Sequence, residues 1–186
     1  MRQSQAEPMP RVVETCWGPR LIDDRPYWHL VAPDGFFYNN VRVGKGALPS
    51  ISASIEAEPA IENAHTPYSL SRMQDGKEQV FEEIRKSKYP TRPPRLKSLY
   101  VFDDLRLVER ALREWFPNER KIPHECRLLT GSAIHKADTA WLNANQEQWR
   151  ENADKYWQGA MTQNPFPEVI VHGAIYFPDW QRFPAA

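Results

Sequence analysis

The strongest structural signal in this sequence is a ten-residue apolar run near its C-terminus, EVIVHGAIYF at residues 168–177. Apolar side chains fall on both faces of the run, a pattern typical of a strand that is covered on both sides. Such a strand needs neighbouring strands, and helices or a second sheet over its faces, so we expect a sheet at the centre of the fold. Strand alternation places its first residue, Glu168, on the same face as Ile170 and His172.

The rest of the chain mixes strand and helix signals without strict alternation, which favours an α+β fold. We expect residues 1–24 to form a weakly ordered, polar N-terminal lead-in and residues 25–186 to form a single domain. The predicted elements are strands at residues 27–32, 41–43, 96–102 and 126–130, a strand or turn that leads into a helix within 47–76, a helix from Gly76 to about residue 88, a helix capped by Asp103 or Asp104, and one or two helices within 137–157.

Prolines outnumber glycines by 17 to eight, which inverts their usual proportions and indicates long irregular connections. Residues 90–95 (PTRPPR) can be neither a helix nor a central strand, because proline has no backbone N–H to donate. Prolines also precede Glu168 in residues 164–167 (NPFP). We therefore expect a stiff backbone at both places.

The charge of the chain is balanced, with 24 basic and 24 acidic residues. This balance excludes a strongly basic protein that binds nucleic acid chiefly through its phosphates. A content of 41% hydrophobic residues is enough to build a packed core, which argues against a disordered chain.

The sequence also bears on the compartment. The N-terminal residues lack the apolar core of a secretory signal, and no apolar run approaches the roughly 20 residues that a membrane span needs. The two cysteines, Cys16 and Cys126, are far apart, so no disulfide framework is expected. We expect a protein that acts in a cytoplasm, with no membrane partner, either where it is made or in a cell that receives it.

Several catalytic motifs are missing. The chain has neither the GxxxxGK[ST] nor the GxGxxG phosphate loop, no GxSxG nucleophile elbow and no CxxC pair near His124, so we predict no metal site. Residues 85–95 (RKSKYPTRPPR) carry five basic side chains, which suit a phosphate-bearing ligand, although a solvated loop has the same composition. Glu168 either meets water at a sheet edge or faces a cleft.

Four stretches together resemble the ADP-ribosyltransferase superfamily, which includes mono-ADP-ribosylating toxins, effectors and toxin–antitoxin enzymes. Residues 168–171 (EVIV) are similar to the strand that begins with the catalytic glutamate of many members, so the resemblance implies that Glu168 is catalytic. Residues 27–31 (YWHLV) look like the family's first strand, and the resemblance implies that His29 contacts an NAD ribose or phosphate.

The other two stretches imply further contacts with NAD. Ser52-Ala53-Ser54 lies where many members have Ser-Thr-Ser, which makes Ser52 a candidate NAD-binding residue. The segment from EEIR (82–85) to PTRPPRLKSLYVF (90–102) resembles a segment of bacterial members, and it implies that Arg85 and Arg95 bind the NAD pyrophosphate. A guanidinium can hold a phosphate through two parallel hydrogen bonds.

The resemblance implies an ADP-ribosyltransferase-like fold, with a split β-sheet core around an NAD cleft and peripheral helices. It implies a mono-ADP-ribosyltransferase that cleaves NAD as a substrate and transfers ADP-ribose to a macromolecular acceptor, a protein or a nucleic acid. A toxin, effector or phage–host conflict role fits a domain of this size, and an antitoxin or a chaperone is a candidate partner.

Two departures from the family pattern keep other functions open. Ala53 replaces the central threonine, and Phe166 stands where arginine-modifying members have Glu or Gln. These differences favour a binding or inhibitor module with the same fold and a degenerate cleft. As a further alternative, the basic segment and Tyr156-Trp157 would bind single-stranded nucleic acid without catalysis.

Overall fold

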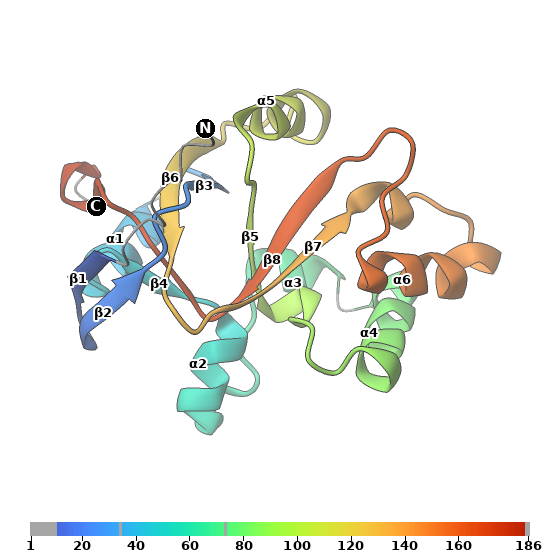
Figure 1. Cartoon of the computed structure of the whole chain (residues 1–186), viewed down its shortest axis with the longest axis horizontal. Helices are drawn as coiled ribbons and strands as arrows, with labels where there is room; N and C mark the ends of the chain where they lie inside the picture. Colours follow the sequence, from blue (N-terminus) through green and yellow to red (C-terminus); the bar gives the residue numbers. More distant parts are fainter. Residues whose placement is uncertain (1–10, 34, 73, 185–186) are drawn as a thin grey trace, which may run out of the picture.

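The computed structural model describes residues 11–33, 35–72 and 74–184 of the chain. Two small antiparallel sheets lie at its centre and diverge from each other (Figure 1). One has the strand order β3-β6-β9-β4 and the other the order β5-β8-β7, and a bridge between Trp28 and Phe102 links them. The strands are β3 Tyr27–Val31, β4 Ala47–Pro49, β5 Leu99–Val101, β6 Ile122–Leu128, β7 Ala133–Asp138, β8 Pro167–His172 and β9 Ala174–Tyr176.

The C-terminal apolar run passes from one sheet into the other. Its first part, β8, lies between β5 and β7, and its second part, β9, lies between β6 and β4. Both parts are interior, as predicted, but a break at Gly173 divides the run into two strands. Gly173 has a φ of 132°, which residues with a side chain rarely adopt. The chain therefore changes sheets at a residue that only glycine fits well.

Alternation along β8 separates two kinds of environment. Val169 and Val171 join the apolar core that also contains Leu128 of β6. Ile170 faces the opposite way, into a second core built with α4 and α6. Glu168 shares the parity of Ile170 and its hydrogen-bond partners lie on the α6 side, so the prediction of its strand face is confirmed.

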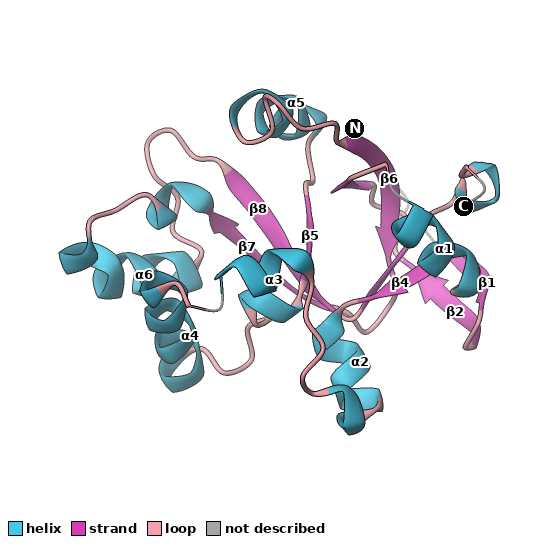
Figure 2. Cartoon of the chain, turned by 180° about the vertical axis from the view of Figure 1, so that it is seen from behind, coloured by secondary structure: helices cyan, strands magenta, loops and turns pink. Residues whose placement is uncertain are grey.

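Helices cover the outer surfaces of the sheets (Figures 1 and 2). Phe81 of α4 and Trp157 of α6 pack with Ile170 of β8, whereas Val108 of α5 packs with Phe102. The helices are α1 Gly35–Val43, α2 Ile51–Ala57, α3 Pro67–Arg72, α4 Gly76–Lys88, α5 Leu105–Glu114 and α6 Trp149–Gln158, with short 3-10 helices η1 Pro59–Ile61, η2 Arg95–Lys97, η3 Thr139–Leu142, η4 Gln146–Gln148 and η5 Trp180–Arg182.

Several predicted elements are confirmed. The helix predicted from Gly76 is α4, and the strand predicted at residues 27–32 is β3. Asp104 caps α5, since its carboxylate accepts a hydrogen bond from the Arg106 backbone N–H at 2.9 Å. The segment within 47–76 contains β4 and then α2, as the strand-to-helix prediction required. The mixture of helices with antiparallel sheets confirms the α+β class.

Other predicted elements are wrong or shifted. Residues 41–43 form the end of α1 rather than a strand, because Tyr38 and Val41 are spaced to share one buried helix face. The predicted helices within 137–157 reduce to η3, η4 and α6. The strand predicted at residues 96–102 begins only at Leu99, because η2 precedes it. The strand predicted at 126–130 overlaps the end of the longer β6, which stops at Leu128.

Part of the expected lead-in is also structured. Residues 11–22 form a hairpin of β1 Arg11–Thr15 and β2 Gly18–Ile22 instead of a weakly ordered segment, and residues 1–10 lie outside the described part of the chain. The hairpin is held because Val13 and Ile22 pack with Leu129 next to β6. Each strand of the hairpin has only five residues, so its alternation of apolar and polar side chains is too short to stand out in this polar segment.

The structure also bears on the cysteines and on membrane-spanning segments. Cys16 is exposed and Cys126 is buried, and both are free thiols. Among the residues that the structure describes, no helix combines the length and the apolar character that crossing a membrane requires.

Gly173→Ala should destabilise the protein. An added Cβ would lie 2.8 Å from the Cα of Ser132, and the φ of 132° adds a backbone strain of about 1–3 kcal/mol. Gly131→Ala is the matched control, because Gly131 has a φ of 94° but nothing within 4 Å of an added Cβ. Urea unfolding should show the larger loss of unfolding free energy for Gly173→Ala, and equal losses would contradict the close crossing at this residue.

Candidate functional site

Glu168 lies at the start of β8, under α6, and is only 6% exposed. Two donors meet on its Oε1 atom: Arg95 Nη1 at 2.6 Å and the Tyr156 hydroxyl at 2.6 Å. Arg95 Nη1 also donates to the Tyr156 hydroxyl oxygen. The three side chains therefore form a closed, hydrogen-bonded triangle inside the protein.

Glu78 of α4 contacts the same arginine from another side. Arg95 Nε donates to Glu78 Oε2 at 3.0 Å, and Arg95 Nη2 donates to Glu78 Oε1 at 3.2 Å. This two-point contact is the strong form of an arginine–carboxylate pair. We refer to Glu78, Arg95, Tyr156 and Glu168 as the carboxylate–arginine cluster, and none of the four is more than 6% exposed.

The charges of the cluster do not cancel, since two carboxylates face one guanidinium. Burial alone would lower the pKa of Arg95, but the tyrosine hydroxyls and the two carboxylates around it outweigh that effect and raise this pKa well above its ordinary value. Burial also raises the pKa of Tyr156 well above its ordinary value, so its hydroxyl stays protonated and donates to Glu168. The guanidinium is what allows two carboxylates to remain inside the fold.

Local signals in the sequence place the members of the cluster. Asp75 caps α4 through the N–H at the second helix position and so fixes the first turn, which contains Glu78. Pro94 precedes η2, which begins at Arg95. The Tyr100 hydroxyl donates to the Arg95 carbonyl oxygen at 2.5 Å and ties this turn to β5.

Asp138 holds the loop between α6 and β8, the loop that connects Tyr156 to Glu168. Its carboxylate accepts hydrogen bonds from the Thr162 backbone N–H at 2.8 Å, from the Thr162 hydroxyl at 2.6 Å and from the Phe166 N–H at 2.8 Å. Burial would raise the pKa of Asp138, but these bonds lower it below its ordinary value. Asp138 thereby fixes the path of the chain that leads into Glu168.

His29 lies one strand away from the cluster. Its Nδ1 donates to the Tyr100 carbonyl oxygen at 2.7 Å, and its ring centroid lies 6.0 Å from that of Phe37 and 6.3 Å from that of Phe177. Burial lowers the pKa of His29, so the side chain is neutral at pH 7. The structure thus links His29 to the strand beside β8 without direct contact with Glu168.

Ser52 meets the other end of β8. Its hydroxyl oxygen lies 2.8 Å from His172 Nδ1 and 3.0 Å from the Ser50 hydroxyl oxygen. His172 Nε2 lies 3.2 Å from Glu56 Oε2, which completes a serine–histidine–carboxylate chain. Ser52 is therefore engaged four residues along the strand from Glu168 and does not join the cluster.

Arg85 has a different role from Arg95. Its Nε and Nη2 donate to the Glu82 carboxylate at 2.8 and 2.7 Å, and its Nη1 donates to the carbonyl oxygens of Pro90 and Arg92 at 3.3 and 2.9 Å. Arg85 holds the proline-rich segment against α4. Of the five predicted site residues, the structure brings Arg95 and Glu168 into contact and leaves Arg85, His29 and Ser52 with other partners.

Sequence reasoning missed two members of the cluster. Glu78 lies three residues before Phe81 and seven before Arg85, so it shares the buried stripe of α4, and a carboxylate on such a stripe indicates a buried partner. Tyr156 gives no comparable signal, because only the path of the α6–β8 loop brings its hydroxyl to Glu168.

A cavity of about 200 Å³ reaches the cluster from outside. It lies below the range of about 300–1,000 Å³ that is typical of small-molecule sites. Chemically, the cluster offers a rigid carboxylate that can stabilise positive charge and an arginine fork that can bind an anion. Its lining residues are Glu78, Glu82, Lys86, Pro94, Arg95, Leu96 and Lys97.

The fold and this site define an α+β domain in which a buried carboxylate–arginine cluster lies between a sheet and two helices. The chain belongs to the family described as "Protein of unknown function (DUF2441)", whose sequence model matches residues 51–179. That match contains all four members of the cluster and leaves out His29 and the N-terminal hairpin. The sequence matches no curated protein.

Arg95→Met removes the cation that joins the two carboxylates. We expect a loss of about 3–5 kcal/mol in unfolding free energy, because both buried carboxylates lose their ionic partner. Arg150→Met is the control: Arg150 pairs with Glu83 at 3.0 Å while both side chains are more than half exposed, and such a pair contributes at most about 1 kcal/mol. If urea unfolding at neutral pH gave equal losses for the two variants, the cluster would not have the role assigned to it.

His135 should make folding dependent on pH. Its Nε2 donates to the Tyr156 carbonyl oxygen at 2.9 Å, and burial lowers its pKa from 6.5 to about 4. The unfolded chain therefore binds the proton more readily, so the stabilisation is complete above about pH 6.5 and is lost as the pH falls toward 4.

His135→Gln keeps an N–H donor but does not titrate. Between neutral pH and about pH 4.5, this variant should lose about 2 kcal/mol less unfolding free energy than the wild type. Chemical denaturation across this range measures the difference. Parallel pH profiles for the two proteins would rule out a buried neutral histidine at this position.

Proposed function

We propose that the chain is a mono-ADP-ribosyltransferase that cleaves NAD and transfers ADP-ribose to a macromolecular acceptor. The observation that carries the proposal is Glu168, a buried carboxylate that Arg95 and Tyr156 hold at the start of an interior strand. Two small sheets that diverge, with helices outside, are also what the ADP-ribosyltransferase resemblance leads us to expect. These features support the assignment from both the sequence and the fold.

The chemistry requires a fixed negative charge. Cleavage breaks the bond between the ribose C1′ and the nicotinamide nitrogen, the electron pair leaves with nicotinamide, and positive charge develops on the ribose. A carboxylate close to C1′ stabilises this charge, as carboxylates do in glycoside hydrolysis. An acceptor nucleophile then bonds to C1′ and loses a proton.

The two oxygens of Glu168 divide this work. Oε1 receives the hydrogen bonds from Arg95 and Tyr156, which hold the carboxylate in place. No described residue donates a hydrogen bond to Oε2, so we assign this oxygen to the nicotinamide ribose. A carboxylate held by neighbours of this kind does not need to reorganise during the reaction.

NAD binding requires the site to open. The cavity of about 200 Å³ beside Arg95 is too small for a dinucleotide, so α4 or the proline-rich segment must move. The NAD pyrophosphate would then replace Glu78 on the arginine fork, since phosphates and carboxylates use the same two-point geometry. We assign Arg95 to the pyrophosphate, and His29, Ser52 and Arg85 to holding the surrounding strands and loop.

The biological setting in the proposal follows from the resemblance. It consists of a toxin, effector or phage–host conflict role in a cytoplasm, with a protein or nucleic acid as the acceptor. An antitoxin or a chaperone is the proposed partner.

A second candidate function is a binding or inhibitor module without catalysis. It is favoured by the internal pairing of the cluster, because Arg95 already satisfies both Glu78 and Glu168. The nucleic-acid alternative has less support. Arg85 and Arg95 are buried with internal partners, and Tyr156 and Trp157 are fully buried, so they offer no stacking surface.

Incubation with NAD should release nicotinamide, measured by chromatography. Glu168→Gln should lower the rate by a factor of at least about 100, because an amide carries no charge to stabilise the ribose cation. Glu147→Gln, which alters an exposed carboxylate on η4, should leave the rate unchanged.

The outcomes separate the two candidate functions. Release by wild type and Glu147→Gln but not by Glu168→Gln supports the enzyme, and labelled NAD in a lysate then identifies the acceptor. Equal release from all three proteins contradicts the role of Glu168. Folded wild-type protein that neither releases nicotinamide nor shows heat with NAD in calorimetry supports the non-catalytic module.

A further inference from the structure

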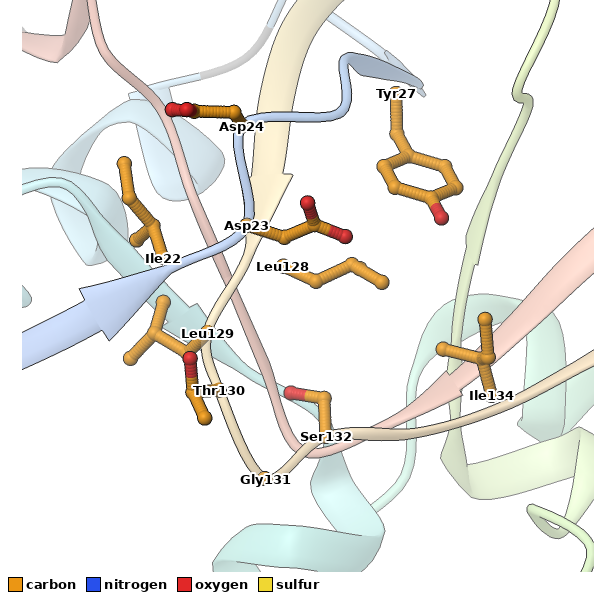
Figure 3. A pocket seen from close by; sticks show the side chains of 10 residues that line it. All are labelled: Ile22, Asp23, Asp24, Tyr27, Leu128, Leu129, Thr130, Gly131, Ser132 and Ile134. Atoms are coloured by element: carbon orange, nitrogen blue, oxygen red, sulfur yellow. The ribbon is translucent and has the colours of Figure 1, made fainter. Parts of the chain in front are cut away.

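A second cavity, of about 380 Å³, lies where the end of β2 meets the end of β6 (Figure 3). Its volume falls within the range of small-molecule sites. The wall is tied together by backbone hydrogen bonds from Asp23 to Leu128 at 2.9 Å and from Thr130 to Leu21 at 2.8 Å. The lining residues are Ile22, Asp23, Asp24, Tyr27, Leu128, Leu129, Thr130, Gly131, Ser132 and Ile134.

The Tyr27 hydroxyl is the first sign that the cavity takes a ligand. Tyr27 is 2% exposed, yet its hydroxyl forms no hydrogen bond with any residue that the structure describes. Figure 3 shows the hydroxyl pointing into the cavity. Among the described residues, the fully buried side-chain atoms without a hydrogen-bond partner are His65 Nδ1 and Ser98 Oγ, so the Tyr27 oxygen is accessible from the cavity and is available to bond to a ligand there.

The charge of the cavity indicates the sign of that ligand. Asp23 and Asp24 line it, and no Lys or Arg does. Asp23 Oδ1 accepts a hydrogen bond from the Arg25 backbone N–H at 3.0 Å, and the Asp23 side chain points toward the space beside Leu128 (Figure 3). The Arg25 guanidinium pairs with Asp103 at 2.6 Å and lies 5.3 Å from the centroid of the Tyr27 ring, so the exposed carboxylate of Asp23 forms no ion pair with it.

The remaining lining is apolar. Ile22, Leu128, Leu129 and Ile134 surround the polar groups. Apolar side chains favour a ligand with a hydrocarbon stem, because burial of such a stem contributes about 0.8 kcal/mol per CH₂ group. The cavity therefore combines one negative region, one free hydroxyl and an apolar wall.

We propose that this cavity binds an organic cation, an ammonium or guanidinium group on a short alkyl stem. The cationic N–H groups would donate to the Asp23 carboxylate and to the Tyr27 hydroxyl oxygen, and the stem would pack on Leu128 and Ile134. Burial raises the pKa of Tyr27, so its hydroxyl is neutral at pH 7 and can accept this bond. A lysine or arginine side chain and a free amine share this chemistry.

The site is independent of NAD cleavage. None of its lining residues belongs to the carboxylate–arginine cluster, and binding needs no catalytic step. If the protein does not bind a cation, the proposal that it cleaves NAD is unaffected. If it does not cleave NAD, the proposal that this cavity binds a cation is unaffected.

Three ligands of similar shape test the proposal: butylguanidinium, butylammonium and the neutral butylurea. We expect NMR titration of the full chain to show millimolar binding of at least one cation, with shifts at residues 128–132, and no binding of butylurea at up to roughly 50 mM. Acetylated lysine and arginine amides then show whether a peptide side chain enters as well as a free amine does.

Matched variants locate the binding. Asp23→Asn keeps the acceptor for the Arg25 N–H but removes the charge, and it should weaken cation binding at least about fivefold. Asp179→Asn, which alters an exposed carboxylate paired with Arg182, should leave binding unchanged. Tyr27→Phe should also weaken binding without loss of stability, which keeps the test open if Asp23→Asn does not fold. Absence of binding by both cations, equal binding of butylurea, or unchanged affinity in both cavity variants would overturn the proposal.

Discussion

The guanidinium of Arg95 donates to two buried carboxylates that come from different elements. Glu78 belongs to α4 and Glu168 to β8, while Tyr156 of α6 bonds to the same Glu168 oxygen. Ionised groups are costly to bury unless they are paired, so these contacts cannot be exchanged for water without a large loss of stability. The positions of both helices against the three-stranded sheet therefore depend on one side chain as well as on apolar packing.

The two proposed sites have no lining residue in common, but both are rich in carboxylates. The carboxylate–arginine cluster has two carboxylates to one guanidinium, and the second cavity has two aspartates and no basic side chain. The chain as a whole is neutral, with 24 basic and 24 acidic residues. Negative charge is thus concentrated at two places that suit positive partners, a developing ribose cation in one case and an organic cation in the other.

The sequence predicted those features that depend on local periodicity. The helix from Gly76 and the buried face of Glu168 follow from spacings within a few residues, and both are confirmed. The break at Gly173 and the hairpin at residues 11–22 were not predicted, because a change of sheet and a short strand pair depend on distant partners.

The contacts within the candidate site also depend on distant partners that the local sequence does not reveal. Arg85 and Arg95 are the same residue type in one basic segment. In the fold, Arg85 donates to the backbone of the following proline-rich loop, whereas Arg95 donates to Glu168. Only tertiary contacts distinguish them. Glu78 carried a usable signal, a carboxylate on an apolar helix stripe, whereas the contribution of Tyr156 depends on a loop whose path Asp138 fixes.

A double-mutant cycle between Arg95 and Glu168 measures whether the ion pair between them holds α4, α6 and β8 together. Urea unfolding of the wild type, Arg95→Met, Glu168→Gln and the double variant gives the coupling free energy between the two side chains. We expect a favourable coupling of about 1–3 kcal/mol, because Glu168→Gln removes one of the two carboxylates that Arg95→Met leaves without a cation. Losses that simply add would contradict the claim that this pair holds the site together.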